Sequence, residues 1–175
     1  MRRLLPLFLS LLLFACQAPP AVVDENSPYY PLPAGSRLTL KQGLTVPAES
    51  AHVTLQGGRV RDDHHVNAYQ PNCRLEVQKR RDTPQKVEPD EFRVRRARHE
   101  QQTARVEGAL RVARRVVDGG PTFVRYQTIL DLESARQPQV RWMICEQWGD
   151  PATGRHLTVR EIRLALGDTF TLTLP

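Results

Sequence analysis

The sequence predicts a mostly β fold, an antiparallel β-sandwich or a small barrel, with one short C-terminal α-helix at about residues 158–166. Three observations predict it. Apolar and polar residues alternate in seven short runs, and a period of two is typical of half-buried strands. Glycine and proline separate the runs, as in antiparallel sheets. A single late segment instead has the helical period together with the signals of a helix start and a helix end.

The predicted strands follow one another from Ala34 to the end of the chain. They cover residues 37–41, 51–56, 73–79, 92–95, 124–132, 139–148 and 169–174. In the sixth run, for example, the alternation places Val140, Trp142 and Ile144 on one face. We expect such apolar faces to form the core.

The predicted helix has a signal at each end. Thr158 and Glu161 form a capping box, and Gly167 stands where a C-cap glycine belongs. Its apolar stripe comprises Val159, Ile162 and Leu166. This stripe favours packing against the core over binding a partner.

Residues 104–117 fit two structures. The spacing of their apolar residues fits a helix, whereas Gly108 and the β-branched residues fit a strand followed by a hairpin turn at residues 118–120. We favour the strand and leave the helix as the alternative.

The first 15 residues are typical of a lipoprotein signal peptide. Two arginines precede 11 largely apolar residues, which are too few for a membrane span, since a helical span needs about 20. Residues 13–16, Leu-Phe-Ala-Cys, resemble the bacterial lipobox. This resemblance implies cleavage before Cys16 and diacylation of its sulfur, which anchors the chain in a membrane. The alternative is an ordinary signal peptide with an incidental cysteine.

Localisation and domain boundaries follow from the same region. Gln17 replaces the aspartate that tends to retain lipoproteins at the inner membrane, which favours the periplasmic face of the outer membrane. Residues 16–33 contain five prolines and are expected to form a tether after the lipidated cysteine. Residues 34–175 are then one periplasmic β domain.

Cysteine parity predicts one disulfide. The chain has three cysteines. If Cys16 becomes a thioether, Cys73 and Cys145 remain, and two thiols of an exported protein tend to pair in an oxidising compartment. The alternative is two unpaired, buried thiols.

One short segment has the residue types of a metal site, namely Asp62, Asp63, His64 and His65. Imidazole and carboxylate suit zinc or copper, so a metal-binding protein or an enzyme using the His64/His65 region is the alternative function. Neighbours in an extended chain point to opposite faces, and a polar loop explains the segment equally well. The sequence has no motif for a catalytic nucleophile or a phosphate-binding loop. We therefore predict neither catalytic residues nor a cofactor.

A basic run between residues 93 and 115 is the candidate anion-binding patch. It contains Arg93, Arg95, Arg96, Arg98, Arg105, Arg111, Arg114 and Arg115. If these side chains share one face, they suit anionic lipid head groups, lipopolysaccharide phosphates or an acidic periplasmic protein. A solvated strand face is the alternative. The run has almost no aromatic residues and the net charge of the chain is only +6, so no nucleic-acid partner is expected.

Four stretches together resemble a family of small proteobacterial envelope lipoproteins that has no assigned activity. They read SRLTLKQGLTVPAESAHVTLQGGRV, AYQPNCRLEV, PQVRWMICEQWGD and LTVREIRLALGDTFTL. The resemblance implies a lipoprotein with a Cys73–Cys145 disulfide and supplies no catalytic residue. We expect a binding or structural module of the cell envelope, held at the membrane by its lipid and meeting an anionic component or a protein partner.

Overall fold

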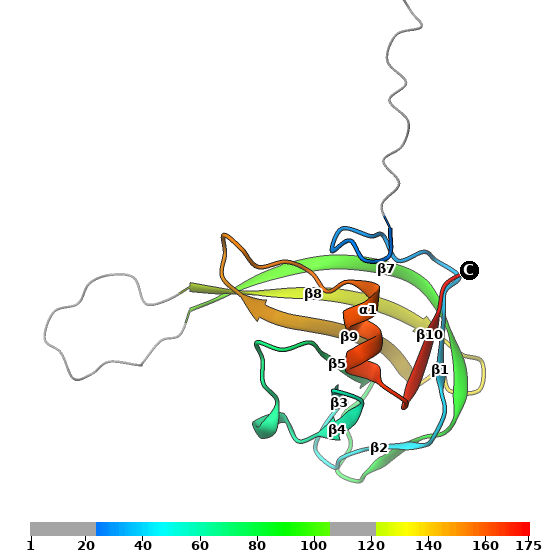
Figure 1. Cartoon of the computed structure of the whole chain (residues 1–175). Helices are drawn as coiled ribbons and strands as arrows, with labels where there is room; N and C mark the ends of the chain where they lie inside the picture. The colour runs from blue at the N-terminus through cyan, green and yellow to red at the C-terminus, as the bar shows by residue number, and fades with distance from the viewer. Residues whose placement is uncertain (1–23, 106–121) are drawn as a thin grey trace, which may run out of the picture.

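The computed structural model describes residues 24–105 and 122–175, and within them the chain is mostly strand (Figure 1). The strands are β1 (Arg37–Leu40), β2 (Leu44–Val46), β3 (His52–Gln56), β4 (Arg59–Arg61), β5 (Asn72–Val77), β6 (Gln85–Val87), β7 (Asp90–Arg105), β8 (Thr122–Glu133), β9 (Val140–Gly149) and β10 (Phe170–Thr173). The helix α1 spans Val159–Leu166, and a short 3₁₀ turn spans Asp63–His65. The predicted mostly β fold with one short C-terminal helix is confirmed.

Eight of the strands form one antiparallel sheet in the order β10-β1-β7-β8-β9-β5-β3-β4, while β2 and β6 pair separately. The large sheet curves into an open half-barrel (Figure 1). Its long centre, β7 to β9, comes from strands of 16, 12 and 10 residues. At one end of the order, β4 is only three residues long, and all three are exposed.

The helix α1 packs on one face of the curved sheet, which we call the inner face; the opposite one is the outer face. The helix contacts β10 at one end of the strand order, and it contacts β3 and β5 near the other end. Apolar side chains of the strands and of α1 meet there in one core, which includes Leu55, Leu75, Phe92, Leu130, Met143, Ile162 and Leu166. The helix thus fills the hollow that an open sheet would leave exposed to water.

Both predicted helix ends are confirmed. The side chain of Thr158 accepts a hydrogen bond from the Glu161 backbone, and the Glu161 carboxylate accepts one from the Thr158 backbone at 2.9 Å. At the other end Gly167 has a φ of +53°, where an L side chain is strained. The Gly58 N–H donates to the Ala165 carbonyl at 3.0 Å, which ties the β3–β4 turn to the end of α1.

The predicted disulfide is confirmed: Cys73 on β5 is bonded to Cys145 on β9. The two cysteines are direct partners in the antiparallel register, and both are completely buried. The bond therefore joins neighbouring strands that are 72 residues apart along the chain.

The prediction that Val140, Trp142 and Ile144 share the core face of residues 139–148 is wrong in part. Val140 lies in the core, but the next core residues of β9 are Met143 and Cys145, while Trp142 and Ile144 lie on the outer face. The reason is a register shift against β5, which adds one residue to β9 after Val140 and reverses the alternation. In the ambiguous segment, residues 104 and 105 end β7, and residues 106–117 lie outside the described residues.

The last residues of the predicted tether lie against the domain. Leu32 is only 6% exposed, and the carboxylate of Glu25 pairs with Arg163 of α1 at 3.0 Å. The packed part of the chain therefore extends upstream of residue 34. In the described ranges, the chain has no helix with the length and apolar character needed to cross a bilayer.

Candidate functional site

The candidate site lies on the outer face of β7, β8 and β9, where three side chains stand in one row. Arg96 of β7 is the register partner of Asp131 of β8, which is in turn the partner of Trp142 of β9. Side chains of directly paired residues lie side by side on one face. The pairing of strands therefore assembles a basic, an acidic and an aromatic group that are far apart in the sequence.

Two β-bulges add an arginine on either side of this row. Between Val94 and Arg96 the register against β8 shifts, so Arg95 is the extra residue of the bulge. A shift after Val140 makes Arg141 the extra residue of the second. A bulge turns a side chain out of strict alternation, and here it keeps the charges of the adjacent Arg95 and Arg96 out of the core.

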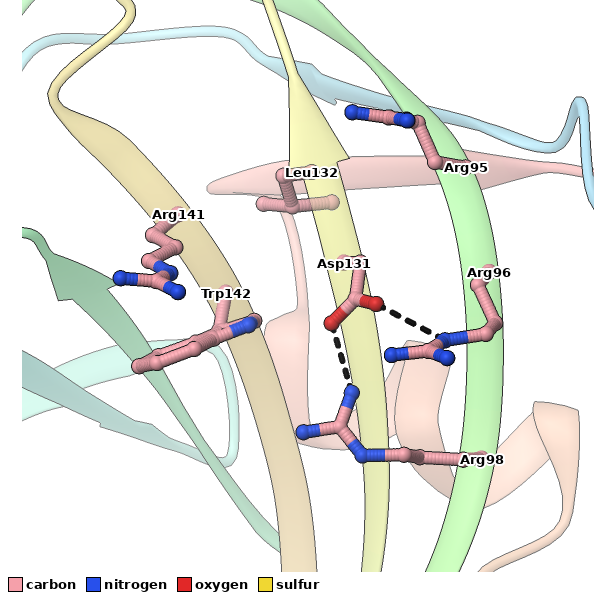
Figure 2. A pocket seen from close by; sticks show the side chains of 7 residues that line it. All are labelled: Arg95, Arg96, Arg98, Asp131, Leu132, Arg141 and Trp142. Carbon is pink, nitrogen blue, oxygen red and sulfur yellow. Dashed lines mark hydrogen bonds and ion pairs between the residues drawn. The ribbon is translucent and has the colours of Figure 1, made fainter.

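These groups surround an open pocket of about 590 Å³ (Figure 2). Its lining consists of Arg95, Arg96, Arg98, Asp131, Leu132, Arg141 and Trp142. We call it the arginine pocket. Four guanidinium groups and one carboxylate give it a net positive charge, which favours an anionic ligand.

Asp131 holds two of the four guanidinium groups in place. Its carboxylate accepts hydrogen bonds from Arg98 Nη1 at 2.6 Å and from Arg96 Nε at 3.0 Å (Figure 2). Burial alone raises the pKa of Asp131, but the hydrogen bonds and charges of Arg98 and Arg96 outweigh it, so the pKa lies below its ordinary value. The carboxylate is therefore ionised at neutral pH, and both arginines are oriented before any ligand arrives.

Arg141 is held by a ring. Its guanidinium carbon lies 4.2 Å from the centroid of the Trp142 ring, a cation–π contact. Among the described residues it makes no ion pair. Its hydrogen-bond donors are therefore available to a ligand in the pocket.

The structure brings only some arginines of the predicted anion-binding patch together in one site. Arg95, Arg96 and Arg98 line the arginine pocket, whereas Arg93 lies at a neighbouring hollow among the carboxylates of Asp90, Glu91 and Glu133. The remaining members are not placed: the side chain of Arg105 and all of Arg111, Arg114 and Arg115 lie outside the described residues. Sequence reasoning missed Asp131, Arg141 and Trp142, because only the register and the second bulge bring them to the site.

The segment of residues 62–65 has a structural role. Asp62 caps the 3₁₀ turn by accepting from the His64 N–H at 2.9 Å. Asp63 accepts from the Thr54 hydroxyl at 2.8 Å and pairs with His52 Nε2 at 2.8 Å; these contacts overcome the effect of burial and lower its pKa. Within residues 24–105 and 122–175, no three His, Cys, Asp or Glu side chains converge on a point where a metal ion could bind.

Comparison of the chain with protein-family models finds no matching family. Comparisons with curated proteins and with solved structures also find no match.

Proposed function

We propose that the chain is a lipid-anchored protein on the periplasmic face of the outer membrane, and that its folded domain binds anionic groups of an envelope component in the arginine pocket. The arginine pocket is the observation that carries the binding activity. The N-terminal sequence supports the anchor through Cys16, which lies outside the described residues. The Cys73–Cys145 disulfide supports an oxidising compartment.

The chemistry of the pocket suits phosphate and carboxylate groups. A guanidinium has five N–H donors in a fixed plane. Arg96 therefore keeps donors for a ligand after it has bound Asp131, and Arg98 keeps donors after it has bound both Asp131 and Glu100. Planar, forked donors recognise carboxylate and phosphate oxygens in pairs. Because Asp131 and Trp142 hold three of the four guanidinium groups, little side-chain entropy is lost on binding.

Calorimetric titration with inorganic pyrophosphate tests the proposal. The full chain, purified in mild detergent, is expected to bind pyrophosphate at low salt and to lose affinity as the salt concentration rises. Arg141→Gln is expected to weaken binding at least several-fold. The matched control is Arg160→Gln, which removes an exposed arginine of α1 far from the pocket lining.

The proposal fails if the unmodified chain does not bind pyrophosphate at millimolar concentration. It also fails if Arg141→Gln and Arg160→Gln bind it equally well, because the bound charge would then lie elsewhere on the surface.

A further inference from the structure

We infer that the ligand is a chain of alternating acidic and neutral sugars, which lies along the outer face of β8 and β9 from the arginine pocket to a second, aromatic subsite. This inference rests on the proposed function and names the class of its ligand.

The aromatic subsite consists of Tyr69, Phe123 and Trp148. The ring centroids of Tyr69 and Phe123 are 5.4 Å apart, those of Tyr69 and Trp148 are 6.2 Å apart, and both pairs meet edge to face. Tyr69 remains 54% exposed. The Arg125 guanidinium carbon lies 5.8 Å from the Trp148 centroid. An aromatic ring beside an arginine thus recurs here, as in the pair of Arg141 and Trp142.

Both subsites lie on the same face of the same two strands. Asp131 pairs with Trp142, and Arg125 pairs with Trp148, in an unbroken register of β8 and β9. The residues 125 and 131 differ by an even number, so their side chains point to the same face. A strand rises about 3.4 Å per residue, which separates the two rows by about 20 Å. A ligand that reaches both subsites is therefore elongated.

The part of the path next to the arginine pocket is hollow and mostly polar. A cavity of about 170 Å³ shares Arg98 and Trp142 with the arginine pocket. Its remaining lining consists of Arg74, Glu76, Glu100, Gln102, Gln127, Ile129 and Ile144. Next to it, the buried Gln127 amide donates to the buried carboxylate of Glu146 at 2.5 Å. The floor of the path is therefore rigid, and its rim offers both donors and acceptors.

The mixture of groups decides the class of ligand. Glu76 and Glu100 line the path, and each already pairs with an arginine of the same lining. Arg74 Nε lies 2.8 Å from Glu76, and Arg98 Nε lies 2.9 Å from Glu100. The path between the arginine pocket and Arg125 therefore carries little net charge. A nucleic acid or a polymer of acidic amino acids carries a charge on every unit, so it would place uncompensated negative charges over this path. A chain in which acidic and neutral sugars alternate combines carboxylates for the arginines, uncharged units for the path and a flat C–H face that packs on aromatic rings. Only this class matches all three features of the face.

Binding of a hyaluronan hexamer, in which glucuronate alternates with the neutral N-acetylglucosamine, to the full chain in detergent tests the inference. We expect the hexamer to bind at least tenfold more tightly than single glucuronate, because it reaches both subsites. Tyr69→Ala should weaken hexamer binding about tenfold and leave pyrophosphate binding unchanged. Tyr29→Ala is the matched control, since Tyr29 is 75% exposed and lies outside both subsites. It should change neither affinity.

Several results overturn the inference while the proposed function stands. One is normal pyrophosphate binding with a hexamer that binds no more tightly than the monomer. Another is hexamer binding that Tyr69→Ala leaves intact. Equal or tighter binding of a thymidine hexanucleotide or of hexaglutamate assigns the face to another class of polymer. A chain that binds neither pyrophosphate nor the hexamer refutes both proposals together.

Discussion

Gly58 and Gly167 are in backbone contact where the β3–β4 turn meets the end of α1. A Cβ atom built on Gly167 would overlap the Cα of Gly58. The hydrogen bond from the Gly58 N–H to Ala165, and another from the Thr169 hydroxyl to the Gly58 carbonyl, fix the two segments together. The contact joins the β4 end of the sheet to the helix that leads into β10.

Replacement of Gly167 by alanine should therefore destabilise the fold. We expect the free energy of unfolding to fall by about 2–4 kcal/mol, from the strained positive φ and from displacement of the Gly58 backbone. Gly57→Ala is the matched control, because Gly57 has a φ of +59° and has no neighbour within 4 Å of an added Cβ. It should cost about 1 kcal/mol. Equal losses in urea unfolding would show that the contact contributes nothing.

Reduction of the Cys73–Cys145 disulfide should lower the free energy of unfolding by about 4 kcal/mol, because the bond closes a loop of 72 residues in the unfolded chain. Urea unfolding with and without dithiothreitol measures this. A Cys73→Ala/Cys145→Ala double variant should unfold at the same urea concentration in both conditions. Alkylation of two thiols in the unreduced, denatured protein would contradict the bond.

The stability should fall as the pH drops from about 6.5 to about 4. His156 is buried and stacks on His99 with centroids 4.2 Å apart. Burial, and next the charge of His99, lower the pKa of His156 from 6.5 to about 4. The unfolded chain takes up a proton at the higher pH, so acid favours unfolding, by up to about 3 kcal/mol. Urea unfolding at several pH values measures this, and His156→Phe should flatten the profile while the exposed His64→Gln should not.

A second loss of stability is expected at lower pH, from Glu161. Arg155 donates two hydrogen bonds of 2.7 Å to its carboxylate, which lower the pKa of Glu161 from 4.5 to about 2 against the opposing effect of burial. A lowered carboxyl pKa stabilises the fold above pH 4.5, and this contribution disappears as the pH falls towards 2. Glu161→Gln should therefore cost about 2 kcal/mol at pH 7. The difference from the unmodified chain should vanish near pH 2; a constant difference would contradict the assignment.

Cys16→Ser should abolish incorporation of labelled fatty acid and release the protein from the membrane fraction. The reason is that the proposed anchor is attached to the Cys16 sulfur. The Cys73→Ala/Cys145→Ala variant should still be labelled and thus serves as the control. Continued labelling of Cys16→Ser would refute the anchor.

The sequence predicts local elements well because their signals are local. The alternation in β1, β5 and β8, and the capping box of α1, need no knowledge of distant residues. The same alternation fails after Val140, because a bulge depends on how β9 pairs with β5. The arginine pocket could not be predicted from the sequence for the same reason. Arg95 and Arg141 turn outwards at bulges, and Asp131 meets Arg96 only through the register of two strands.

The short strand β4 also affects whether the domain aggregates at high protein concentration. An unpaired sheet edge is a template on which another chain can add a strand, and long, flat, apolar edges lead to aggregation. The edge at β4 offers three residues, and two of them, Arg59 and Arg61, carry positive charge. Two such edges repel each other before their backbones can pair. The open half-barrel can thus reach high local concentration without growing into fibrils through β4.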